Sequence, residues 1–181
     1  MAHGVVNTTK VKSTRVGHIY SLAINEDIDN GSIGSVGDLL AGEMEVRAFV
    51  KPLTADLTKR SVVVIATPEL IYDQSTKVAG AFVNFFNAKN IPMVGLSLVA
   101  DDELEVSVSM IDAIVATVPV VGNYLVAQNA SCKLKEVATL VGTEKFVAKI
   151  EYIRASGIST FIGGNALSTI YNLVGYRVIQ N

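Results

Sequence analysis

The stretch Glu103-Leu104-Glu105-Val106-Ser107-Val108-Ser109-Met110 alternates between polar and apolar residues along its whole length. A period of two is typical of a β-strand that is buried on one side, because successive side chains of a strand point to opposite faces. The pattern predicts that Leu104, Val106, Val108 and Met110 face a core while the polar set faces solvent. An antiparallel sheet with one wet face has this arrangement.

Working outward from this stretch, other segments also have the character of strands. Residues 43–48 alternate in the same way, and residues 145–152 do so less strictly, with Phe146, Ala148, Ile150 and Tyr152 on one side. Residues 62–66 form a continuous apolar run that is short enough for a buried strand. Further strands are expected at residues 16–24 and 176–179.

Helical signals are few. The apolar residues of segment 77–88 fall near helical spacing, so this segment is either a short helix or an aromatic loop, and segment 110–117 is ambiguous in the same way. Turn residues such as Gly95, Gly122 and Gly142 separate the remaining strands. Many short strands at this spacing predict a mainly β fold, an antiparallel β-sandwich or barrel with at most one or two short helices.

The length of 181 residues fits one domain, or two small β subdomains that are tightly joined. Residues 1–15 are polar and small, so we expect an N-terminal arm there, followed by a single β-rich domain over residues 16–181. Residues 25–37 are rich in Asn, Asp, Ser and Gly and predict a loop. Residues 39–46 weakly resemble residues 98–106, which indicates either a duplicated β unit or two turns of similar chemistry.

Composition limits the environment of the chain. Half of the residues are apolar, only 18% are charged, and the mean hydropathy is +0.41, so something must cover an apolar excess. The longest apolar stretch, residues 113–121, contains Pro119 and is far shorter than the roughly 18 residues of a spanning helix. No membrane partner is therefore expected, and the N-terminus lacks the pattern of a signal peptide. A dense β core or burial in an assembly would each account for the excess.

Charge and cysteine content argue against two further classes. The net charge is −2, and the small basic clusters, such as Lys10, Lys12 and Arg15 or the pair 133 and 135, form no extended basic region, so no nucleic-acid partner is expected. Cys132 is the only cysteine, which excludes a disulfide within the chain and a zinc site built on cysteines. We expect it to be a small core residue.

Few residues are suited to catalysis. His3 and His18 are the only imidazoles, one in the expected arm and one in an expected strand. A nucleophilic Ser, Thr or Cys needs a base within hydrogen-bonding reach, and no motif such as G-x-S-x-G supplies that setting. The sequence therefore predicts no catalytic residue and no enzyme.

Cofactor and metal motifs are also weak. Asp101, Asp102, Glu103 and Glu105 lack the loop spacing of a calcium site, so a solvated acidic turn is expected, although cation binding there stays open. The glycines of residues 31–37 are more widely spaced than in a dinucleotide-binding loop. Those at 157, 163 and 164 are not followed by the Lys-Ser/Thr of a phosphate-binding loop. No cofactor-binding or metal residue is predicted.

The order of several short motifs is nevertheless distinctive. A glycine-rich loop leads into Asp38-Leu39-Leu40-Ala41-Gly42-Glu43, and Val62-Val63-Val64-Ile65-Ala66-Thr67-Pro68-Glu69 follows. Then come Tyr72-Asp73, Phe82-Val83-Asn84-Phe85-Phe86-Asn87, Gly95-Leu96-Ser97-Leu98 and the turn Asp101-Asp102. This order resembles that of small head-associated proteins of tailed bacteriophages, of the capsid decoration or head-fibre-base type.

The resemblance implies a non-enzymatic structural protein of the virion. Such a protein is assembled in the host cytoplasm and binds the outer surface of the head, where its partner is the major capsid protein; self-association of the chain stays open. Under this interpretation, residues 1–15 would contribute to attachment and not to folding; the alternatives are a frayed terminus with no role and a strand that pairs within the fold. The alternative is a small-ligand or carbohydrate-binding β-domain on a fibre or cell surface, although such modules usually display exposed aromatics and this chain has no Trp.

Overall fold

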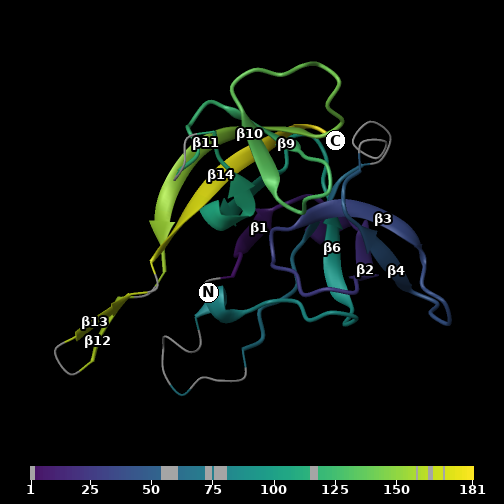
Figure 1. The fold of residues 1–181 in the computed structure, drawn as a ribbon, viewed down its shortest axis with the longest axis horizontal. Coiled ribbons are helices and arrows are strands. Elements are labelled where there is room, and N and C mark those ends of the chain that lie inside the picture. The colour runs from purple at the N-terminus through teal and green to yellow at the C-terminus, as the bar shows by residue number, and fades with distance from the viewer. Residues whose placement is uncertain are drawn as a thin grey trace.

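The computed structural model describes residues 3–53, 61–71, 75, 81–114, 118–157, 159–162, 165–168 and 170–181. The fold is mainly β, as predicted, and combines a small closed barrel with an open seven-stranded sheet (Figure 1). Helical structure in the described part of the chain is confined to the four-residue helix α1 (Ser13–Val16) and two 3₁₀ turns, η1 (Phe82–Asn84) and η2 (Val108–Met110). This agrees with the prediction of at most one or two short helices.

The barrel contains five strands in the order β2-β4-β3-β5-β6, and every pair except the parallel pair β2–β4 is antiparallel. Leu22, Phe49 and Ile65 pack inside it. Gly95 allows this packing, because a Cβ there would lie 2.4 Å from Leu22 Cδ1. The barrel strands are β2 (Ile19–Ala23), β3 (Ile33–Leu39), β4 (Val46–Val50), β5 (Val63–Ile65) and β6 (Met93–Ser97).

The open sheet has the order β1-β7-β14-β11-β9-β10-β8. Its inner face shares one core with residues of the barrel strands, such as Val64 and Leu96. The side chain of Asn181 also joins the two parts by hydrogen bonds to the backbone of Val62 and Leu98. The strands of this sheet are β1 (Val6–Lys10), β7 (Glu103–Ser107), β8 (Ile111–Asp112), β9 (Tyr124–Ala127), β10 (Leu134–Val137), β11 (Val147–Ser156) and β14 (Tyr171–Gln180).

A separate two-stranded ribbon, β12 (Ser159–Ile162) and β13 (Asn165–Ser168), continues the long β11–β14 hairpin. It pairs with no other described strand and lies at the end of the molecule away from the barrel (Figure 1). The sequence between Arg154 and Arg177 contains no charged residue.

The strand expected at residues 103–110 is β7, but it is shorter than predicted. Leu104, Val106 and Met110 are buried as expected, although residues 108–110 form η2 and not a strand. The prediction of a wet opposite face is wrong, because Glu105 and Ser107 are also buried. Side chains of neighbouring strands cover Glu105, and the hydroxyl of Ser107 accepts a hydrogen bond from the backbone N–H of Val5 (3.1 Å).

The alternation predicted for residues 145–152 fails at its last position. Phe146, Ala148 and Ile150 are buried, whereas Tyr152 is 42% exposed on the other face. The register between β11 and β14 shifts between Ile150 and Tyr152, and this irregularity reverses the side on which later residues point. The Tyr152 ring lies over Gly175, where a Cβ would come within 2.3 Å of the ring.

The N-terminal segment is part of the fold. For residues 3–15, which the structure describes, the prediction of an arm outside the domain is wrong. β1 pairs with the edge of β7, and Val5 and Val11 are buried. A short polar strand suits this position, because an edge strand has one side that no other strand covers.

The remaining segments agree in part with the expectations. The strands expected at 16–24, 62–66 and 176–179 are present as β2, β5 and the longer β14, whereas β4 begins only at Val46, and β3 starts within the loop expected at 25–37. Of the two ambiguous segments, residues 82–84 form η1, and residues 110–112 run from η2 into β8. Residues 77–80 and 115–117 lie outside the described residues.

Candidate docking surface

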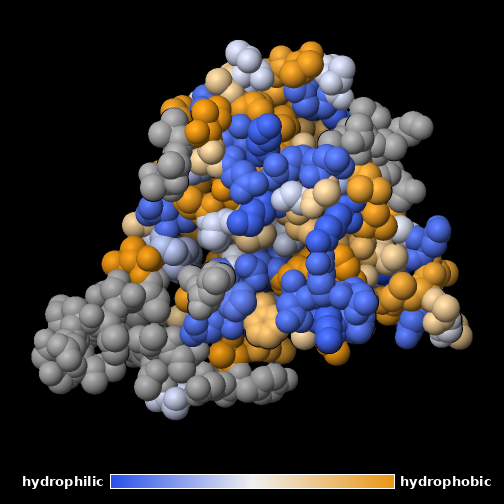
Figure 2. All heavy atoms as spheres, viewed as in Figure 1, coloured by the Kyte–Doolittle hydropathy of each residue, from blue (hydrophilic) through white to orange (hydrophobic). Residues whose placement is uncertain are grey.

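Large apolar side chains remain exposed on the loops of the molecule although the strands bury their core faces. Figure 2 shows hydrophobic groups along the rim of one face, around a centre that is largely hydrophilic. One group belongs to the loop between β8 and β9, which we call the 114–123 loop and which is described at residues 114 and 118–123. Its exposed members are Ile114 (53%), Val118 (38%), Val120 (49%) and Val121 (54%).

A single buried carboxylate holds this loop. Glu136 of β10 is 1% exposed. Its Oε2 accepts a hydrogen bond from the backbone N–H of Ile114 (2.9 Å), and its Oε1 accepts from the backbone N–H of Val120 (2.8 Å) and from Asn123 Nδ2 (2.6 Å). One side chain therefore fixes both ends of the loop.

The carboxyl group of Glu136 is ionised at neutral pH. Burial by itself would raise the pKa of the carboxyl, but the hydrogen bonds from Val120, Ile114 and Asn123 favour the ionised form and hold the pKa below its ordinary value. The loop is consequently pinned by charge-assisted hydrogen bonds, which are stronger than neutral ones. The exposed apolar side chains of Ile114 and Val120 thus lie on backbone that Glu136 anchors.

A second apolar region surrounds a hollow of about 430 Å³ lined in part by Phe85, Phe86 and Ile91. The ring of His3 stacks on Phe86 with a centroid distance of 5.1 Å, and His3 Nδ1 lies 2.8 Å from an oxygen of Asp29. His3 therefore packs against one of the rings that line this hollow, and its side-chain polar contact is to a carboxylate and not to a nucleophile.

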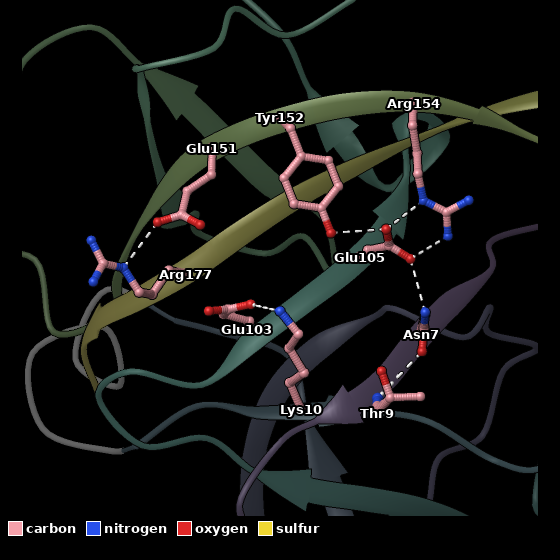
Figure 3. Close-up of polar contacts among 9 residues, drawn as sticks. All are labelled: Asn7, Thr9, Lys10, Glu103, Glu105, Glu151, Tyr152, Arg154 and Arg177. Carbon is pink, nitrogen blue, oxygen red and sulfur yellow. Dashed lines mark hydrogen bonds and ion pairs between the residues drawn. The ribbon is translucent and has the colours of Figure 1, made fainter.

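The face of the sheet opposite the shared core carries a network of polar side chains from β1, β7, β11 and β14 (Figure 3). Glu105 lies at its centre. Arg154 donates to both carboxylate oxygens (2.5 Å each), Tyr152 OH donates to Oε1 (2.9 Å), and Asn7 Nδ2 donates to Oε2 (2.8 Å). The network ties β1 to the neighbouring strand β7, and it ties β7 to β11 across β14, which lies between those two strands.

These contacts decide what Glu105 can do. The bidentate hydrogen bond from Arg154, helped by Asn7 and Tyr152 against the effect of burial, lowers the pKa of Glu105 to about 2. A general acid or base works best with a pKa near the working pH. Glu105 is therefore suited to joining strands and poorly suited to proton transfer near neutral pH.

The same shift predicts an acid-dependent loss of stability. Because the folded pKa of about 2 is below the ordinary carboxyl value of 4.5, the contribution of Glu105 is fully present above about pH 5 and is lost as the pH falls toward 2. We expect about 2 kcal/mol from this group, after a discount for screening at the half-exposed Arg154. Glu105→Gln should lose most of this amount at about pH 7 and little at about pH 2 in denaturant titrations. A pH-independent difference between the two proteins would contradict this assignment.

The acidic turn is not uniformly solvated, which corrects the prediction. Asp101 is exposed, but Asp102 is buried and accepts hydrogen bonds from the backbone N–H groups of Lys12 and Val99 (2.8 Å each). Glu103 pairs with Lys10 at the surface. In the part of the chain that the structure describes, no group of three or more His, Cys, Asp or Glu side chains is arranged to hold a metal ion.

The other sequence candidates are dispersed. His18 is exposed at the start of β2 with a φ of 65°, and Cys132 is partly buried, with burial raising the pKa of its thiol to about 11. The glycine-rich stretch 31–37 is largely strand β3. Gly31 has a φ of +84°, and a Cβ there would lie 2.5 Å from Val106. Gly163 and Gly164 lie outside the described residues.

Sequence reasoning missed Glu136, although a signal was present. In Leu134-Lys135-Glu136-Val137, period two places Glu136 on the same side as Leu134, which is fully buried. A carboxylate on the core side of a strand requires partners, because an unpaired buried charge is costly. The backbone of the nearby apolar loop was a possible source of these partners.

Comparison with known proteins adds no relative. No family model, curated protein or solved structure matches the chain. Among the described residues, no helix is both long enough and apolar enough to cross a membrane.

Proposed function

We propose that this chain is a non-enzymatic structural protein that attaches to the outer surface of a tailed-phage capsid. The 114–123 loop, held by Glu136, is the observation that carries the proposal. Its partner would be the major capsid protein, and its location the surface of the virion. The order of short motifs, which resembles that of head-associated proteins, supports the same reading.

The energetics of the loop favour docking on a protein surface. Exposing four neighbouring apolar side chains to water is unfavourable. Burying them against a partner stabilises the complex by roughly 25 cal/mol per Å² of apolar area. Binding also costs entropy when loops must be ordered. Glu136 already fixes the backbone at Ile114 and Val120, so much of this ordering cost is met in the folded chain.

The test is co-sedimentation with undecorated shells of the major capsid protein encoded in the same genome. Val120→Asp/Val121→Asp should fold normally, because both side chains are about half exposed, and should bind at least about tenfold more weakly. Ile179→Asp is the matched control, since Ile179 is 47% exposed on a different element, β14. Wild-type binding by the double variant would contradict the proposal.

The hollow beside Phe85 and Phe86 favours a second candidate, a small-ligand or carbohydrate-binding domain. Phe86 is 41% exposed, and its ring offers a surface on which a ligand in this hollow could stack. Saturable binding of a saccharide or other small molecule that is lost in Phe86→Ala, with no binding to shells, would favour this function over attachment to a capsid.

A further inference from the structure

The tip of the β3–β4 hairpin projects from the barrel (Figure 1). Met44 is 90% exposed there and is flanked by Glu43 and Glu45, which are also exposed. Neither glutamate makes an ion pair with any residue that the structure describes. The tip is therefore an apolar knob between two negative charges.

A hollow of about 420 Å³ with complementary chemistry lies between α1 and the turn at residues 99–102. Val11, Val99 and Ala100 contribute apolar surface, and Lys10, Lys12 and Arg15 contribute positive charge. Lys10 is paired with Glu103, whereas Lys12 and Arg15 are exposed and have no ion-pair partner among the described residues.

The negative charges beside the hollow do not cancel this basic rim. Asp102 is buried and its carboxylate is used by two backbone N–H groups. Asp101 is exposed, and its described ion-pair partner is Arg177, at 3.9 Å. Two cations, Lys12 and Arg15, thus remain available to an incoming acidic group.

We infer that this hollow receives the β3–β4 tip of a second copy of the chain. Met44 of one copy would pack on Val99 and Ala100 of the other, and Glu43 and Glu45 would meet its basic rim. A second copy is the occupant to expect, because one chain carries both the knob and the hollow, with opposite charges.

The topology allows each copy to place its β3–β4 tip in the hollow of the other copy. β2 and β4 run parallel with Ser21 beside Val46, so α1, which precedes β2, and the tip, which precedes β4, lie toward the same end of the barrel. A closed two-fold dimer requires a self-complementary patch of this kind. This inference does not depend on attachment to a capsid.

Sedimentation equilibrium of the full chain, without shells, tests the inference. The wild-type chain should self-associate, more weakly at high salt because the rim contacts are exposed ion pairs. Lys12→Glu/Arg15→Glu and Glu43→Lys/Glu45→Lys should each weaken association by at least about tenfold, since like charges then meet in both contacts. An equimolar mixture of the two variants should recover it, because each contact again joins opposite charges.

The matched control is Lys133→Glu/Lys135→Glu, which makes the same change in net charge on and beside β10. It should associate like the wild type, and circular dichroism should show that all variants are folded. A wild-type chain that stays monomeric at its highest soluble concentration would overturn the inference. So would a mixture of the two variants that fails to recover association.

Discussion

Val106→Asp is expected to lower the free energy of unfolding by more than about 4 kcal/mol or to prevent folding altogether. Val106 is fully buried in the middle of β7, where it lies between Val6 of β1 and Val174 of β14. A carboxylate there would be desolvated with no partner. Denaturant titration of the purified variant, or its recovery only in aggregates, measures the effect.

Ile179→Asp makes the same kind of change at an exposed strand position and should cost less than about 1 kcal/mol. Ser107→Asp, which the alternation alone would place in solvent, should also destabilise the protein. Ser107 is 3% exposed, and its hydroxyl accepts a hydrogen bond from Val5. Equal stability of the Val106 and Ile179 variants would show that the face assignment of β7 is wrong.

Glu136→Ala is expected to cost about 3 kcal/mol, because it leaves three donors without their acceptor in a buried site. The amide protons of Ile114 and Val120 should then exchange with solvent much faster, which hydrogen exchange can measure residue by residue. The folded pKa of Glu136 lies below its ordinary value, so the part of this contribution that depends on the charge of the carboxylate is present above about pH 4.5 and decreases at lower pH.

Glu144→Ala provides the comparison for Glu136. Glu144 also accepts backbone hydrogen bonds, from Val141 and Gly142, but it lies at the surface, so its removal should cost less than about 1 kcal/mol. If the two variants were equally stable, the carboxylate of Glu136 would not be what holds the 114–123 loop.

Local alternation in the sequence was sufficient to determine the class of fold and part of its core. Leu104, Val106 and Ile150 are buried where period two placed them, and the continuous apolar run at 62–66 is the buried strand β5. These predictions succeed because the direction of a side chain along a strand depends on the backbone of that strand alone.

Pairing between strands distant in the sequence decided the features that periodicity did not predict. Whether residues 6–10 form a free arm or an edge strand depends on β7, almost a hundred residues away, and the register shift that turns Tyr152 outward exists only against β14. The role of Glu136 likewise requires the 114–123 loop to fold back over β10. Periodicity predicts the face of the strand on which a side chain lies, but not the residues that it contacts. Register and contacts depend on pairing between segments far apart in the chain.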